Sequence, residues 1–168
     1  KLQDMGGIFS SELHQVDHIF IPEGVPFPPP LTTPVLRVRD QDGEYFFTLK
    51  ISQSGRQDSI ERELQITDGE MMLEILKLLK WKETVIVDKK RIKTKVKDME
   101  IVLDDVKGLG DFIEAEKITT NEDQEARKKI QDELCEFLKT IGVDDEDVLV
   151  NHKYDIMLND IHNKFGVK

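Results

Sequence analysis

The sequence predicts an α+β domain in which antiparallel strands form one sheet and helices pack against its apolar face. Two observations support this fold class. Apolar and charged residues alternate along several short segments, and turn signals such as Asp42-Gly43 join them, which is typical of strands and hairpins. Three other segments carry apolar residues at helical spacing. The 168 residues suit one domain that is large enough to bury a core.

The chain opens with KLQDMGGIF, which we interpret as the last turn of a helix. Leu2 and Met5 are apolar and three residues apart, and the glycine pair after them can supply the left-handed residue that ends a helix. A strand is predicted over 13–21, and a proline-rich loop over 22–34 follows it. Because the last of the six prolines is Pro34, no proline interrupts the chain after this loop.

The middle of the chain is predicted to combine strands with one helix. The Asp-Gly pair after 35–40 predicts a hairpin, and a polar loop over 52–58 precedes the next strand. Asp68 can cap a helix over 69–80, whose apolar residues form one stripe. The strands predicted in this part of the chain cover 35–40, 44–51, 60–67, 83–96, 99–106 and 111–118.

The end of the chain is predicted to be helical. Asn121, with Gln124 three residues later, resembles a capping box and predicts a helix that ends at Ile141. A last helix is predicted over 154–164, with an apolar stripe directed inward.

Composition limits the classes of function. The chain has 24 Lys and Arg against 34 Asp and Glu, and the net charge of −10 argues against a general nucleic-acid binder. No apolar run approaches the roughly 18 residues that suggest a membrane span. The single cysteine, Cys135, excludes an internal disulfide and suits a reducing compartment. We therefore expect a cytoplasmic protein that binds neither a membrane nor a nucleic acid.

The predicted strands separate basic from acidic positions. Side chains two residues apart in a strand face the same side, so each strand would have one charged face and one largely apolar face. The lysine-rich segment 89–97 fits one such strand better than an RNA-binding stripe, because it has no interleaved aromatic residues. The positions that alternate in this way include Arg37, Arg39, Lys50, Glu61, Glu63, Lys89, Arg91, Asp104, Glu114 and Glu116.

An ordinary sheet with one face in water would show the same alternation in any single strand. A sheet that curls under helices would instead enclose its charged face as a tunnel. Such a tunnel would hold Arg and Lys for phosphoryl oxygens beside carboxylates that suit a hard divalent cation.

Five segments resemble the CYTH superfamily, also called the triphosphate tunnel metalloenzymes. They are V-L-R-V-R (35–39), F-T-L-K (47–50), E-R-E-L-Q (61–65), K-K-R (89–91) and L-D-D-V-K-G-L-G-D-F-I-E-A-E (103–116), of which the last is the most specific. The resemblance is strongest to CyaB-type class IV adenylyl cyclases and their thiamine-triphosphatase relatives. It implies an eight-stranded antiparallel β-barrel, the triphosphate tunnel, with helices packed outside and with Mg²⁺ or Mn²⁺ as cofactor.

By position, the resemblance implies five phosphate-binding cations and a set of metal-binding carboxylates. Lys50 and Arg91 are the expected catalytic residues. Glu61 could replace Glu63, because the family's E-x-E on this strand is read here at 61–63 or at 63–65, where a glutamine removes one charge. The expected phosphate-binding residues are Arg37, Arg39, Lys50, Lys89 and Arg91, and the expected metal ligands are Glu114, Glu116, Glu63 and Asp104.

The resemblance also implies a difference at the start of the chain. The family begins with an E-x-E-x-K strand followed by a helix, and this chain begins at what we interpret as the end of that helix. We therefore expect residues 1–168 to form a single CYTH-like domain that lacks this first strand.

Three functions follow from the resemblance as alternatives. The first is a divalent-metal-dependent enzyme of the CyaB type, which converts ATP to cyclic AMP and pyrophosphate. The second is a triphosphatase that hydrolyses tripolyphosphate or thiamine triphosphate, and the third is a non-catalytic module that binds polyphosphate or nucleotide. The expected partner is a small molecule with a triphosphate group, and a homodimer is one possible assembly.

Overall fold

The structure is a computed structural model that describes residues 1–55, 58–119, 123–149 and 153–165. Seven strands lie in this part of the chain, in agreement with the seven that the sequence predicts. The strands are β1 (Leu13–Pro22), β2 (Val35–Gln41), β3 (Glu44–Gly55), β4 (Asp58–Ile66), β5 (Trp81–Val96), β6 (Met99–Val106) and β7 (Gly110–Glu116). The helices are α1 (Gly69–Leu78), α2 (Gln124–Ile141) and α3 (Tyr154–Phe165), with a short 3-10 turn η1 (Asp145–Asp147).

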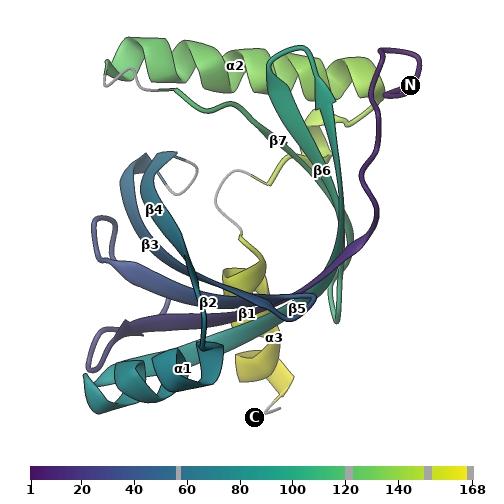
Figure 1. The fold of residues 1–168 in the computed structure, drawn as a ribbon. Helices are drawn as coiled ribbons and strands as arrows, with labels where there is room; N and C mark the ends of the chain where they lie inside the picture. The colour runs from purple at the N-terminus through teal and green to yellow at the C-terminus, as the bar shows by residue number, and fades with distance from the viewer. Residues whose placement is uncertain (56–57, 120–122, 150–152, 166–168) are drawn as a thin grey trace.

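The strands form one antiparallel sheet that curls into a half-barrel (Figure 1). Its order is β4-β3-β2-β1-β5-β6-β7, so β4 and β7 are the two edges of the described sheet. Arg127 on α2 pairs with Asp58 at the start of β4, at 2.9 Å between Nη1 and Oδ1. This ion pair joins the edge strand β4 to the helix that covers the other end of the sheet.

The strand register places the charged side chains on one face of the sheet. Arg37 lies opposite Thr48, and Thr48 lies opposite Glu63 in the next strand. Arg91 lies opposite Asp104 in the same way. We call this the inner face, because the sheet curls around it.

Two helices cover the opposite, outer face, as the sequence predicts. Leu76 of α1 packs on Phe20 and Val38, and Phe137 of α2 packs on Val96 and its neighbours. Because an amphipathic helix removes the apolar side of the strands from water, each helix stabilises the part of the sheet that it covers.

Helix α3 differs from α1 and α2, because it contacts the inner face. One end of that face is apolar, and Leu158 of α3 packs there with Ile19, Val85, Val87 and Val106. This end would otherwise expose a row of aliphatic side chains, so the last helix closes it.

The ends of the elements follow from local hydrogen bonds. Asp68 caps α1 by accepting from Met71 N at 2.8 Å, as predicted. Helix α2 is capped by Asp123, which accepts from Ala126 N at 2.9 Å, whereas the predicted cap Asn121 lies outside the described residues. At the start of the chain, Gly7 N donates to the Leu2 carbonyl, and Gly6 has φ +87°. These features are typical of a helix C-terminus, but residues 2–6 form hydrogen-bonded turns and no helix is present in residues 1–12.

Several element bounds differ from the prediction, and one short element was not predicted. Strand β3 continues to Gly55, so most of the polar loop predicted over 52–58 is strand, because Ser52 still pairs with Ser59. Helix α1 ends at Leu78, two residues early, and Lys80 has φ +64° at the turn into β5. The turn η1 was not predicted, because its sequence has no apolar period.

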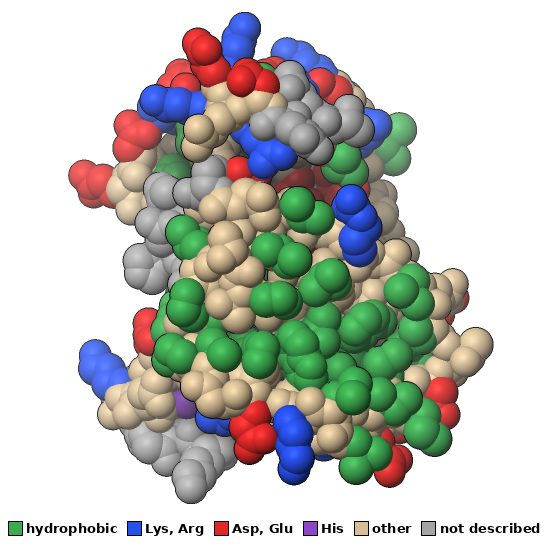
Figure 2. All heavy atoms as spheres, turned by 90° about the vertical axis from the view of Figure 1, so that its left-hand side faces the viewer, with side chains coloured by type: hydrophobic (Ala, Val, Ile, Leu, Met, Phe, Trp, Pro, Cys, Tyr) green, Lys and Arg blue, Asp and Glu red, His purple; other side chains and the backbone are tan. Residues whose placement is uncertain are grey.

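Part of the surface is apolar. Figure 2 shows hydrophobic side chains over much of the side where β3, β4 and α1 lie in Figure 1. None of the helices in the described part of the chain has the length and hydrophobicity needed to cross a membrane. The exposed apolar side chains on α1 and β4 are Ile60, Leu64, Met71, Ile75 and Leu78.

The outer-face core predicts a large effect for Phe20, which has 0% exposure. Truncation by Phe20→Ala should lower the free energy of unfolding by about 3–5 kcal/mol, because it leaves a cavity under α1. Urea unfolding followed by the fluorescence of the single tryptophan, Trp81, measures this. Leu78→Ala is the control, since Leu78 is 72% exposed and should change stability by less than about 0.5 kcal/mol. Equal effects of the two changes would contradict the assigned core.

Candidate functional site

The inner face contains a buried ion pair between β1 and β2. Asp17 and Arg39 are register partners. The two carboxylate oxygens of Asp17 accept hydrogen bonds from Arg39 Nε at 2.6 Å and from Nη2 at 2.7 Å. Burial alone would raise the pKa of Asp17, but Arg39, with Arg37 and Lys89, lowers it to about 2. Asp17 is therefore a carboxylate at neutral pH.

A second buried pair joins β5 to β6. Arg91 Nε donates to Asp104 Oδ1 at 2.7 Å, and Arg91 Nη2 donates to Glu114 Oε2 at 3.0 Å. Lys89 lies between the two buried pairs, with Nζ 3.9 Å from Asp17 and 3.6 Å from Asp104. Burial and the neighbouring charge of Arg91 lower the pKa of Lys89 to about 8, against the opposite effect of the two aspartates.

Two further pairs are more exposed and form a rim across β2, β3 and β4. Arg37 Nη2 donates to Glu63 Oε2 at 3.0 Å and to Thr48 Oγ1 at 3.1 Å. Lys50 pairs with Glu61 on the facing strand. Burial opposes the shift, but the charge of Lys50 lowers the pKa of Glu61.

The two glutamates of β7 also face inward. Strand alternation puts Glu114 and Glu116 on the same side as Arg91. Burial and the negative charge of Glu114 raise the pKa of Glu116, and Arg91 and Lys50 oppose this. Two neighbouring carboxylates that repel each other are suitable oxygen donors for a hard divalent cation, because the cation would neutralise both.

The described residues offer such a cation only part of a coordination shell. Among them, no group of three or more His, Cys, Asp or Glu side chains is arranged to hold a metal ion. The donor chemistry of Glu114 and Glu116 fits Mg²⁺ or Mn²⁺, and phosphate oxygens and water commonly complete the shell of such ions.

The nine sequence-predicted site residues all lie on the inner face. The strand registers place them opposite one another or opposite other inner-face residues, and alternation within each strand places them on the same side. Ion pairs through Asp17 and Asp104 form a continuous series, and Lys50 pairs separately with Glu61. The predicted residues in the continuous series are Glu63, Arg37, Arg39, Lys89, Asp104, Arg91 and Glu114.

Sequence reasoning missed one cation, Lys153. Burial and the nearby charge of Lys50 lower the pKa of Lys153 to about 8, and Asp155 and Glu61 partly oppose this. Lys153 immediately precedes α3, which brings it to the inner face from a distant part of the sequence. Neither periodicity nor a motif marks it, so only the packing of α3 reveals it.

Tyr154 occupies the boundary between the apolar and charged ends of the inner face. Its ring packs on Phe112, with centroids 4.9 Å apart, and Lys89 Nζ lies 5.2 Å from the ring centroid. Burial and the carboxylates of Glu114 and Asp104 raise the pKa of Tyr154. Its hydroxyl is therefore neutral at physiological pH.

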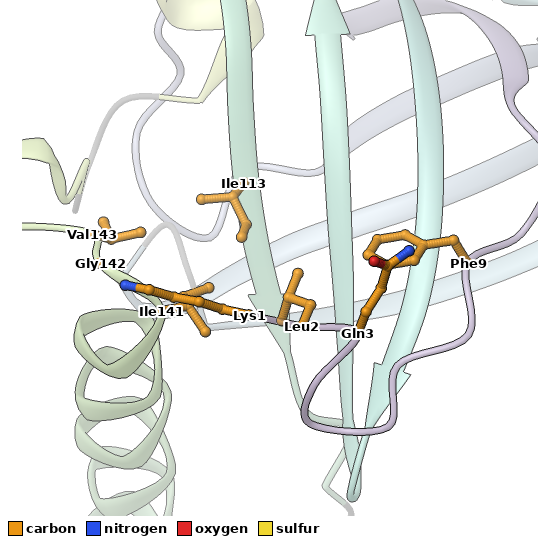
Figure 3. A pocket seen from close by; sticks show the side chains of 8 residues that line it. All are labelled: Lys1, Leu2, Gln3, Phe9, Ile113, Ile141, Gly142 and Val143. Carbon is orange, nitrogen blue, oxygen red and sulfur yellow. The ribbon is translucent and has the colours of Figure 1, made fainter.

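A pocket of about 450 Å³ lies elsewhere, between the N-terminal segment, β7 and the end of α2 (Figure 3). Leu2, Phe9, Ile113 and Ile141 give it an apolar lining, and the Lys1 side chain extends along it toward Gly142. Ile113 packs in the core under α2, on the face of β7 opposite Glu114. This pocket is therefore separate from the charged inner face.

The lowered pKa of Lys153 predicts a pH-dependent cost in stability. Below pH 8 the folded chain holds a charged Lys153, and above pH 10.5 the amine is neutral in both folded and unfolded chains. Lys153→Met should therefore stabilise the chain by about 3 kcal/mol at pH 7, and this gain should shrink as the pH rises from 8 to 10.5. Urea unfolding between pH 7 and 10.5 measures it.

The matched control for this change is Lys129→Met on the exposed side of α2. It should change the free energy of unfolding by less than about 0.5 kcal/mol. A Lys153→Met chain that is less stable than the wild type at pH 7 would contradict the burial of this cation.

Comparison with known proteins identifies the family. The sequence profile of the CYTH domain matches residues 4–151. A Methanocaldococcus jannaschii protein named "Putative adenylate cyclase" is 34% identical over 120 residues, which are 70% of this chain and 67% of that protein.

Solved structures agree with this match. The PH1012 protein of Pyrococcus horikoshii is 27% identical with a TM-score of 0.74, over 92% of this chain and 88% of that one. A Vibrio parahaemolyticus protein named as a putative adenylate cyclase has the same fold, with 18% identity and a TM-score of 0.71 over 94% of this chain and 89% of that one. The chain belongs to the CYTH domain family.

Proposed function

We propose that this chain is a divalent-metal-dependent enzyme that acts on the triphosphate group of a nucleotide, converting ATP to cyclic AMP and pyrophosphate. The observation that carries this proposal is the cluster of cations from three strands on one inner face, beside carboxylates from the other four. Membership of the CYTH family and the name of the Methanocaldococcus jannaschii relative support it. The cations are Arg37, Arg39, Lys50, Lys89 and Arg91, with Lys153 added from the start of α3.

Charge balance supports the requirement for a metal. The carboxylates of the inner face nearly equal its cations in number, and the ion pairs engage most of them. A triphosphate brings about four negative charges, which this balanced face would not neutralise alone. Glu114 and Glu116 would hold the divalent cation, with Glu63 or Glu61 as a further donor, and the cation would supply Lewis-acid polarisation of a phosphoryl oxygen. The geometry of Asp104, whose oxygens already accept from Arg91, favours a structural role over metal binding.

The side chains of the inner face would bind and orient the phosphates. Arg91 and Lys50 have donors near the exposed carboxylates, so they would contact oxygens on which negative charge develops. In cyclisation, the ribose 3′-oxygen forms a bond to the α-phosphorus, the bond from that phosphorus to the β-phosphate oxygen breaks, and pyrophosphate leaves. The 3′-hydroxyl proton passes to solvent or to a carboxylate. In-line positioning by fixed cations lowers the barrier to this step.

Hydrolysis of tripolyphosphate or thiamine triphosphate is the alternative reaction. A water oxygen would then form a bond to the terminal phosphorus, the bond from that phosphorus to the bridging oxygen would break, inorganic phosphate would leave, and the water proton would pass to solvent or to a carboxylate. The same cations and carboxylates would serve both reactions. Binding without turnover is the second alternative. The cyclase proposal also requires adenine recognition, for which the proline-rich loop over 22–34 is our candidate, because it leads into β2 and Arg37.

Product analysis separates these functions. The full chain is incubated with ATP, thiamine triphosphate or tripolyphosphate and with Mg²⁺ or Mn²⁺, and products are resolved by ion-exchange chromatography. Cyclic AMP and pyrophosphate are expected from ATP, and a chelator should abolish them. Release of inorganic phosphate would support the triphosphatase, and calorimetric binding with no product over hours would support the binding module. Undiminished turnover with the chelator would contradict the role of the metal.

Removal of one rim cation should reduce turnover without unfolding the sheet. Lys50→Met is expected to lower kcat/KM by about 10²–10³-fold, because Lys50 would stabilise charge on the phosphates. Lys90→Met is the matched control: Lys90 lies in β5 beside Lys89, but its side chain is exposed on the outer face. Steady-state kinetics measure both variants, with circular dichroism to check the fold. Equal kcat/KM for the two would overturn the role of Lys50.

A further inference from the structure

Asp17 lies at the centre of the inner face, where it has 3% exposure. Its strand, β1, is the middle strand of the sheet, and Asp17 is opposite Arg39 on one side and Val87 on the other. A carboxylate in this position can reach cations on both neighbouring strands. It is also shielded from water, which strengthens its interactions with them.

One carboxylate serves three cations here. Arg39 donates to both oxygens of Asp17, which is the bidentate arrangement that fixes a guanidinium plane. Asp17 Oδ2 is also 3.8 Å from Arg37 Nη1 and 3.9 Å from Lys89 Nζ. These contacts occupy the carboxylate, so its oxygens are directed at protein cations and not at a bound metal.

Asp17 uses only part of the donor set of Arg39, which leaves the other N–H groups of this guanidinium for a ligand. A guanidinium has five N–H groups, and Asp17 accepts from two atoms of Arg39, Nε and Nη2. Arginine side chains that are free to rotate lose entropy on binding, whereas a fixed guanidinium does not. The buried ion pair therefore prepares the cation before the ligand arrives.

We propose that Asp17 is a positioning residue that fixes Arg39, and holds Arg37 and Lys89 directly beside it, for contact with the phosphate groups of the ligand. This inference rests on the proposed function for the identity of the ligand. Asp17 itself does not contact the ligand. The negative charge and the two-oxygen geometry of its side chain are both needed, because the first neutralises the buried cations and the second fixes the plane of the Arg39 guanidinium.

The first test is a spectroscopic readout that does not depend on activity. In the full chain labelled with ¹⁵N, the Nε–H resonance of Arg39, identified with Arg39→Lys, should exchange slowly with water. Asp17→Asn should accelerate this exchange at least tenfold, because one charged acceptor is lost. Asp88→Asn is the matched control, since Asp88 pairs with His14 and Lys107 and not with Arg39. Slow exchange that persists in Asp17→Asn would overturn the proposal.

The second test is binding of tripolyphosphate with Mg²⁺, measured by calorimetry. Asp17→Asn should weaken binding at least tenfold, Asp17→Glu should restore part of the loss, and Asp88→Asn should have no effect. Arg39→Lys keeps the charge but loses the planar donor pair, so it should weaken binding to a similar extent even if Asp17→Asn does not fold. Wild-type affinity in Arg39→Lys would overturn the proposal.

The two tests also separate this inference from the proposed function. A wild-type chain that binds no triphosphate and forms no product would contradict the proposed function. The Arg39 resonance would still decide whether Asp17 fixes the guanidinium.

Discussion

The structure depends on the pairing of charges that are buried within a sheet. Arg39, Lys89 and Arg91 are each less than one tenth exposed, and a lone buried charge of this kind would cost several kcal/mol. Asp17 and Asp104 neutralise them from neighbouring strands. Because a shift of one residue in β1 would turn Asp17 to the outer face, the ion pairs also fix the register of the strands that carry the site.

The periodicity of the sequence was sufficient to predict seven strands and the face of each site residue, because alternation in a strand depends only on local geometry. Arg37 and Glu114 could be placed in this way without knowledge of the pairing. Alternation also places Asp17 on the face of its strand opposite to His14 and His18, but its role as the shared partner of three cations could not be predicted, since that role depends on three strands meeting. Lys153 could not be predicted either. It immediately precedes α3, and the position of α3 is determined by its packing on the apolar end of the inner face, which the sequence pattern does not reveal.

The ion pairs of the inner face differ in how easily they can exchange partners. The buried bidentate pair of Asp17 and Arg39 would leave an unpaired charge if it opened, so it stays closed. The rim pairs Arg37–Glu63 and Lys50–Glu61 are partly exposed, and such pairs contribute only about 0–1 kcal/mol. A phosphate ligand can therefore displace the rim carboxylates and leave the buried pairs intact. The buried ion pairs therefore stay in place, whereas the rim cations can exchange their carboxylate partners for phosphate.

Two pairs of like charges remain in this arrangement. Lys50 and Lys153 repel each other, and Glu114 and Glu116 repel each other, as the directions of their pKa shifts indicate. A phosphate group between the lysines would remove the first repulsion, and a divalent cation between the glutamates would remove the second. Because the anion and the cation also attract each other, each would strengthen the binding of the other by the same factor. The repulsions that lower the stability of the free chain therefore favour joint binding of phosphate and metal.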